Sequence, residues 1–164
     1  MLTKSYESEV DSSEKMEYFK TDILEEIICI PNQKPDMEKI LDILVSSDVI
    51  SYKIVETDTA ISNEGQNLTG IKLVVKLRIK EKVTYVANRV EQPVHAAHYE
   101  NIKNVFVILP KKIDNEDTCK LVKTGRLKVD CYIEAVEARQ IDCRCIHKCI
   151  SLLVNVKKVK RVVK

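Results

Sequence analysis

The longest regular pattern in the chain is a strict alternation of apolar and polar side chains over residues 71–86. Its even positions are mostly lysine or arginine. Its odd positions carry Ile71, Leu73, Val75, Leu77, Ile79, Glu81, Val83 and Tyr85. Successive side chains of a β-strand point to opposite faces, so this period of two predicts a long strand with one buried face. Glu81 interrupts the apolar row, and we expect a bend near it.

Shorter apolar stretches predict further strands on both sides of this segment. They lie at residues 18–30, 49–59, 93–99, 105–109, 121–136 and 141–156. Their apolar residues are mainly Val, Ile and Leu, and β-branched side chains favour sheets. Pro31 and Pro110 stop two of the stretches, and the last two are expected to join near residues 137–140.

One segment has the spacing of a helix instead. Pro35 precedes it, and Asp36 and Glu38 would lie in a first turn that favours negative charge. Positions i, i+3, i+4, i+7 and i+8 are occupied by Met37, Ile40, Leu41, Leu44 and Val45. This spacing predicts a short α-helix over residues 36–46, with its apolar stripe packed into the core.

Together these elements predict an all-β fold, a mainly antiparallel, jelly-roll-like β-sandwich with one short helix. A chain of 164 residues is long enough to bury a core as a single domain. We expect that domain to span residues 18–156. Residues 1–17 are polar and acidic and are predicted to be a flexible arm, and residues 157–164 form a basic tail.

Charge and hydropathy argue against several classes of partner. The formal net charge is only +2, which implies no obligate polyanion. The basic positions of residues 72–82 lack interleaved aromatic side chains for stacking bases, so we expect a solvated face and no nucleic acid. Lysines break the longest apolar runs, so no membrane span is expected. The first residues have no apolar core of a secretory signal peptide.

The six cysteines are the main candidates for chemistry. Cys143, Cys145, His147 and Cys149 occupy every second position of one segment, while Cys29, Cys119 and Cys131 lie elsewhere. On a strand, Cys143 and Cys149 would be about 20 Å apart. Zinc needs its ligands roughly 2 Å from one point. A metal site made of Cys143, Cys145, His147 and Cys149, or a cross-strand site that adds Cys131 or Cys119, is therefore the minor alternative.

Redox catalysis is less favoured than cross-linking. The chain has no Cys-x-x-Cys motif, and no helix N-terminus is predicted near the thiols to lower their pKa. Neighbouring cysteines on one strand face are poor disulfide partners for each other, but they can bond to another strand or another subunit. The cross-linking candidates are Cys143, Cys145, Cys149, Cys131, Cys119 and Cys29. The alternative is that some of them are small buried apolar residues.

His95 and His98 do not form a catalytic pair. Three residues apart in an extended segment, they point to opposite faces. No nucleophile or carboxylate accompanies them in a recognisable motif, so structural hydrogen bonding is the better interpretation. We expect no enzymatic activity and no cofactor.

Several short motifs resemble the SPOCS domain, which occurs in clostridial spore-coat and spore-morphogenesis proteins. The resemblance covers about residues 18–156, and its most specific part is Gln-Pro-Val-His-Ala-Ala-His at residues 92–98. The other matching segments are residues 31–36, 64–70, 85–87, 107–110 and 132–136. Many relatives carry several such domains or a peptidoglycan-binding module, whereas this chain has one domain. Ile102, Lys103 and Asn104 replace the aromatic residue that often follows the His-Ala-Ala-His segment.

The resemblance implies a structural, self-assembling subunit of the endospore surface, in the coat, the exosporium or an appendage fibre. Such a protein would be made in the mother-cell cytoplasm without a signal peptide and exposed to air after lysis. Homo-oligomers or filaments are expected through strand edges, the arm, the tail and disulfides, and other coat proteins are candidate partners. The alternative is an adaptor that docks on a coat scaffold protein without polymerising. The family supplies no catalytic residues.

Overall fold

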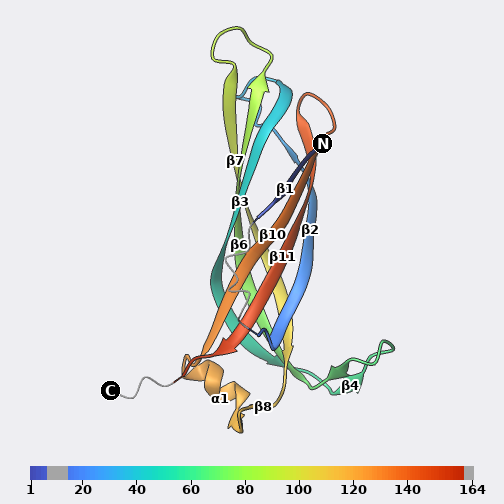
Figure 1. The fold of residues 1–164 in the computed structure, drawn as a ribbon, viewed down its shortest axis with the longest axis vertical. Helices are drawn as coiled ribbons and strands as arrows, with labels where there is room; N and C mark the ends of the chain where they lie inside the picture. Colours follow the sequence, from blue (N-terminus) through green and yellow to red (C-terminus); the bar gives the residue numbers. More distant parts are fainter. Residues whose placement is uncertain (7–14, 161–164) are drawn as a thin grey trace.

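The computed structural model describes residues 1–6 and 15–160 and shows an elongated sandwich of two β-sheets (Figure 1). No helix in these ranges is long and apolar enough to cross a membrane. The elements are β1 (Leu2–Ser5), β2 (Tyr18–Cys29), β3 (Met37–Glu56), β4 (Ala60–Ile61), β5 (Asn67–Leu68), β6 (Ile71–Ala87), β7 (Val94–Leu109), β8 (Lys112–Ile113), β9 (Glu116–Asp117), α1 (Thr118–Lys123), β10 (Leu127–Gln140) and β11 (Cys145–Lys158). The prediction of a mainly antiparallel all-β fold is confirmed.

The first sheet has four strands in the order β1-β10-β11-β2. The hairpin of β10 and β11 forms its centre, and both pairings of β11 are antiparallel. On β2, Cys29 pairs with Cys145 at one end and Tyr18 with Val156 at the other. The segment with the alternating cysteines is therefore a central strand with neighbours on both sides.

The second sheet has the order β3-β6-β7. Its central strand confirms the alternation in the sequence, because every odd residue from Ile71 to Ala87 is buried. The ladder between β6 and β7 passes the pair Glu81–Tyr99 without a register shift. Glu81 therefore marks no break in the strand; it is an acidic side chain in a buried position.

The core lies between the inner faces of the two sheets and consists largely of Val, Ile and Leu. Leu73, Leu77 and Ile79 come from one sheet, and Ile146 and Ile150 from the other; all five are fully buried. Burying a side chain of this size contributes about 1.5–3 kcal/mol. This apolar layer holds the sheets face to face.

Side chains, rather than backbone ladders, join the edges of the two sheets. On one side, the Tyr52 hydroxyl donates to the carbonyl of Leu127 at 2.8 Å, and the Ser47 hydroxyl donates to that of Cys131 at 3.1 Å. On the other side, Lys103 Nζ donates to the carbonyl of Ile23 at 2.5 Å. These bonds occupy backbone acceptors that an open strand edge would offer to another chain.

The helix predicted over residues 36–46 is wrong, because this segment is the first half of β3. Register shifts occur between Met37 and Lys39 and between Ile40 and Asp42. Each bulge adds a residue to one strand, so the inward positions Met37, Ile40 and Ile43 are spaced by three instead of two. A bulged strand thus imitates the spacing of a helix. Leu41 and Leu44 of the predicted stripe are instead 43% and 46% exposed.

Three other boundaries differ from the prediction. The two strands expected at residues 93–99 and 105–109 are one continuous strand, β7. The only helix of the described residues is α1, which replaces the start of the strand predicted over residues 121–136; the Asp117 side chain accepts a bond from Lys120 N at its start. Asp117 is a favoured capping residue and ends the strand pattern there. The turn between β10 and β11 lies at residues 141–144, beyond the expected 137–140.

Part of the predicted arm belongs to the sandwich. Residues 2–5 form β1 and pair with β10 of the same chain, from Leu2–Ala138 to Ser5–Ala135. The Tyr6 hydroxyl accepts a bond from Val45 N at 2.8 Å. Residues 7–14 of the arm and 161–164 of the tail lie outside the described residues. The tail residues 157 and 158 complete β11.

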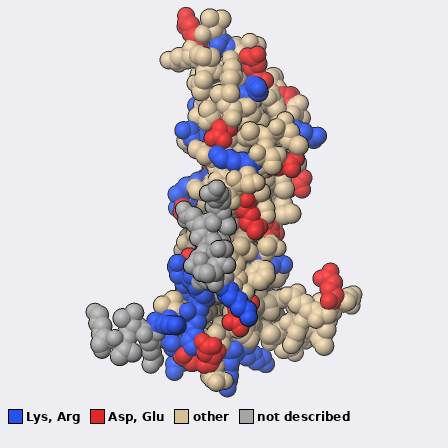
Figure 2. Space-filling view, viewed as in Figure 1, with Lys and Arg blue, Asp and Glu red and all other residues tan. Residues whose placement is uncertain are grey.

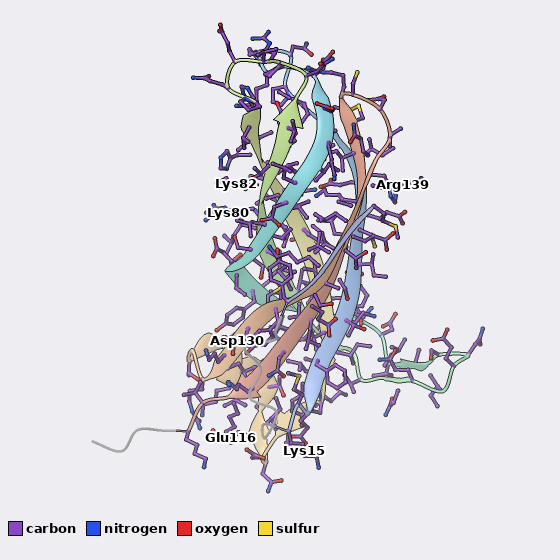
Figure 3. All side chains as sticks on the ribbon, turned by 45° about the horizontal axis from the view of Figure 1, so that its top comes forward. Lys15, Lys80, Lys82, Glu116, Asp130 and Arg139 are labelled. Carbon is purple, nitrogen blue, oxygen red and sulfur yellow. A yellow bond between two sulfur atoms is a disulfide. The ribbon has the colours of Figure 1, made fainter. Side chains whose placement is uncertain are left out.

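Charged side chains gather at the end of the sandwich where α1 and β8 lie (Figure 2). Glu116, labelled in Figure 3, accepts bonds from Arg126 Nη2 at 3.1 Å and contacts Lys158 Nζ at 2.8 Å. The hydrogen bonds from Arg126 and then Lys158 lower the pKa of Glu116 to about 2. Its carboxylate is therefore stabilised in the folded state.

We expect Glu116→Gln to reduce the acid sensitivity of the fold. The folded pKa of about 2 lies below the ordinary 4.5, so Glu116 contributes stability above pH 4.5 that is lost as the pH falls towards 2. Thermal unfolding from pH 6 to pH 2 measures this loss, with Glu64→Gln in an exposed turn as the control. Equal pH dependence of wild type and Glu116→Gln would contradict the assignment.

Candidate functional site

The two faces of β11 carry different chemistry. Cys145, His147 and Cys149 are partly exposed on its outer face, and Ile146, Lys148 and Ile150 are buried on its inner face. The predicted row is thus real for three of its four members. Cys143 instead lies in the turn before the strand and is exposed.

Cys29 and Cys145 form a disulfide within the chain. They are directly opposite each other on β2 and β11, and their Cα atoms are 4.1 Å apart. The bond joins residues 116 positions apart and ties the edge strand β2 to the centre of the sheet. The sequence predicts both cysteines as cross-linking candidates, to another strand or another subunit, and in the structure they bond to each other across two strands.

Cys149 is a free thiol in acidic surroundings. Burial raises its pKa, and the nearby carboxylates of Glu25 and Glu137 raise it further. His147 Nε2 lies 2.8 Å from Glu25 Oε1, between the disulfide and Cys149. The thiol of Cys149 therefore stays protonated at neutral pH, which disfavours nucleophilic attack and metal binding.

Cys143 is the most accessible thiol of the described residues, because the other free cysteines are partly covered. Its turn is held by Asp142, whose Oδ1 accepts bonds from Arg144 N and Cys145 N at 2.7 Å. The carbonyl of Cys143 accepts a bond from Met37 N at 2.8 Å. The backbone is thus fixed while the thiol faces solvent.

Cys131 and Cys119 lie far from the row. Cys131 pairs opposite Val154 and packs against the core, and burial raises its pKa. Cys119 is on α1, with its Sγ 3.8 Å from Glu56 Oε1, and burial also raises its pKa. Neither is placed beside Cys143 or Cys149, and both of these cross-linking candidates are free thiols within the chain.

The residues of the alternative metal site do not converge. Among residues 1–6 and 15–160, no group of three or more His, Cys, Asp or Glu side chains is placed to hold a metal ion. Cys145, one of the four ligands considered, is in the disulfide. His95 and His98 are on opposite faces of β7, as predicted: His95 stacks on the buried ring of Tyr85, and His98 is exposed.

Arg144 is a structural residue that the sequence pattern did not reveal. Its Nη1 donates to the carbonyl of Lys34 at 2.9 Å and to Asp36 Oδ1 at 2.8 Å. Its Nη2 donates to the carbonyls of Ile30 and Pro31, each at 2.8 Å. One planar guanidinium thereby fastens residues 30–36 to the turn that carries Cys143.

The inner face of β11 contributes a buried ion cluster between the two sheets. The side chain of Lys148 is fully buried, and its Nζ contacts Oε1 of Glu81 on β6 and Oε1 of Glu26 on β2. Asn101 Nδ2 donates to Glu26 Oε2 at 2.7 Å. Fully buried charged side chains are rare, and those that occur are paired, as Lys148 and Glu81 are here.

The pKa of Glu81 is shifted by its buried position. Burial raises its pKa, although the hydrogen bond and charge of Lys148 oppose the shift. Its second oxygen, Oε2, is buried and has no hydrogen-bond partner. The sequence contained a signal, because both Glu81 and Lys148 occupy buried positions of alternating strands; their pairing depends on which strands face each other.

The outer face of β2 carries an exposed apolar row. Phe19, Ile23 and Ile27 are 53%, 57% and 61% exposed and are spaced every four residues. The row leads along the strand to Cys29 and hence to the disulfide and the turn of Cys143. Thr21 and Glu25 alternate with these three residues on the same exposed face, and apolar side chains repeated along one strand in this way favour a contact surface.

The outer face of β6, in the other sheet, is basic. Lys80 and Lys82, labelled in Figure 3, project from β6 on the other side of the molecule from Arg139. Lys80 pairs with Asp48 at 2.7 Å and Arg78 with Glu100 at 3.2 Å, all of them well exposed. Neighbouring carboxylates thus partly neutralise this face.

No family model matches the chain, and no curated protein or solved structure matches it.

Proposed function

We propose that this protein is a structural subunit of the bacterial endospore surface that assembles with copies of itself. The observation that carries the proposal is the exposed row Phe19, Ile23 and Ile27 on edge strand β2, next to the accessible thiol of Cys143. The setting on the spore surface rests on the resemblance of the sequence motifs to the SPOCS domain.

The apolar row favours association through the face of β2. Ile and Phe side chains of this row are about half exposed. When a second copy covers that exposed half, each side chain contributes roughly 1 kcal/mol to the free energy of association, at about 25 cal/mol per Å² of apolar surface. The free edge of β2 is less suited to strand pairing, because Lys103 and Tyr99 already bond to its carbonyls at Ile23 and Cys29. The described part of the arm pairs within its own chain as β1. We therefore place the contact on the face of the strand.

Cys143 supplies the covalent step of the proposed assembly. Two exposed thiols from neighbouring copies form a disulfide when molecular oxygen accepts their electrons, which requires an oxidising setting. A cytosol keeps such thiols reduced, so cross-linking would follow lysis of the mother cell. Synthesis and assembly would then be separated in time.

Oxidised and reduced samples distinguish assembly from a monomeric adaptor. We expect covalent dimers in non-reducing electrophoresis of the oxidised wild type, and their loss in Cys143→Ser. We expect Ile23→Lys/Ile27→Lys to abolish association in light scattering even with reductant. Ile102→Lys is the matched control, because Ile102 is 45% exposed on the other sheet. An oxidised wild type that stays monomeric would support the adaptor instead.

A further inference from the structure

Lys148, Glu81 and Glu26 place an amine and two carboxyl groups together inside the sandwich. Lys148 comes from the four-stranded sheet and Glu81 from the three-stranded sheet, and both side chains are fully buried. The Nζ atom contacts one oxygen of each carboxylate. The reactive groups are thus held in contact before any reaction.

The interior favours the uncharged forms of these groups. Separated charges are costly in a low-dielectric core, and a cluster of one ammonium and two carboxylates keeps a net negative charge. Burial raises the pKa of Glu81, so it is the natural acceptor for a proton from Lys148. Tyr99, the cross-strand neighbour of Glu81, has a pKa raised to about 12 by burial and stays neutral. Transfer of a proton from Lys148 to Glu81 would leave a neutral amine beside a carboxylic acid.

We propose that Lys148 and Glu81 condense to an intramolecular isopeptide bond, with Glu26 as the catalytic carboxylate. The Nζ atom attacks Cδ of Glu81, a new C–N bond forms, and the C–O bond to Oε2 breaks. One ammonium proton stays on the amide nitrogen, and the other two leave with Oε2 as water. Glu26 accepts a proton from the attacking nitrogen and returns it to the leaving oxygen. The net charge is unchanged and no oxidant is needed.

Three observations favour Glu81 over Glu26 as the acylated residue. Oε2 of Glu81 has no hydrogen-bond partner, so it can depart without breaking one. Both oxygens of Glu26 are engaged, by Lys148 and by Asn101. The Glu26 side chain is also 27% exposed, whereas that of Glu81 is shielded from the water that would reverse the reaction. Asn101 acts as a positioning residue that orients Glu26.

Proximity makes the condensation feasible. An amine and a carboxyl group held in contact react as if at effective concentrations of about 10⁵–10⁸ M. Proton transfer by a positioned carboxylate adds roughly 10²–10⁴-fold. The product is a neutral amide that removes the buried ion pair and links β11 to β6 across the core.

Intact mass spectrometry of the reduced, denatured wild type tests the proposal. We expect a mass lower than that of the sequence by one water. After reduction, alkylation and trypsin digestion, the dipeptide Glu81–Lys82 should be joined to residues 145–157, because a linked Lys148 resists cleavage. The full sequence mass, or a link from Lys148 to Glu26 instead of Glu81, would overturn it.

Variants then test the role of Glu26. Glu26→Gln keeps the shape of the side chain but removes its basicity, and we expect the linked fraction to form about 100-fold more slowly. Glu25→Gln is the matched control, since Glu25 points to the outer face and bonds to His147. Equal rates for Glu26→Gln and wild type would contradict a catalytic role. The wild-type mass decides the bond itself, whatever the variants do.

Discussion

Replacing Cys29 and Cys145 by serine lowers the free energy of unfolding by about 4 kcal/mol. The disulfide closes a loop of 116 residues, and the loss of chain entropy in the unfolded state grows with loop length, reaching roughly 4–5 kcal/mol for loops near this size. Guanidinium unfolding of wild type and double variant measures the difference. Edge strand β2 should be the first segment to gain amide hydrogen exchange, because its backbone then pairs only with β11 and is otherwise held by side-chain contacts.

Cys119→Ser is the control for the serine substitutions. Cys119 is a free thiol on α1 with its Sγ 3.8 Å from Glu56 Oε1 on β3, so we expect its replacement to change the stability by less than about 0.5 kcal/mol. Adding reductant to the wild type should reproduce the loss seen in the double variant. If reductant leaves the unfolding midpoint of the wild type unchanged, the bond contributes nothing and the loop argument fails.

Compared with wild-type chains in which Lys148 and Glu81 have not condensed, Lys148→Met lowers the free energy of unfolding by about 3–5 kcal/mol at neutral pH, because breaking a buried pair leaves an uncompensated charge. Glu81 is then the buried group without its cation, and its pKa, already raised by burial, rises further. A raised folded pKa means that stability is highest below the ordinary pKa of 4.5 and falls as the pH rises above it. Urea unfolding between pH 4 and pH 8 measures this trend.

Two further variants separate charge from packing. Lys80→Met removes an outward-facing lysine of β6 that precedes Glu81 and forms a half-exposed pair with Asp48. This change should lower the free energy of unfolding by less than about 1 kcal/mol. Lys148→Met/Glu81→Leu replaces the pair by apolar groups and should recover most of the loss. If Lys148→Met proves as mild as Lys80→Met, the cluster has no energetic importance.

The sequence pattern determined the fold class but not the local irregularities. The alternation of β6 was readable because every buried position is two residues from the next. In β3, bulges change the spacing of Met37, Ile40 and Ile43 to three, and a bulge depends on the partner strand as much as on the residues themselves. The false helix followed from that difference.

For the candidate sites, the sequence could predict which face of its own strand a residue occupies, but not its partner on another strand. The outward position of Cys145, His147 and Cys149 follows from a period of two. The bond between Cys29 and Cys145 does not, because six cysteines allow 15 complete pairings and strand neighbours decide among them. Likewise, nothing in the sequence pattern around Lys148 identifies Glu81 as its partner, because Glu81 is 67 residues away in the other sheet.

The side-chain bonds that close the sandwich edges make its mechanical resistance depend on direction. A force that pulls the two sheets apart acts on individual hydrogen bonds, such as those from Tyr52 to Leu127 and from Lys103 to Ile23. These hydrogen bonds can break one after another. A force along the strands instead shears the long ladder between β3 and β6, whose hydrogen bonds share the load. A layer built from this protein would resist stretching along its strands better than peeling across them.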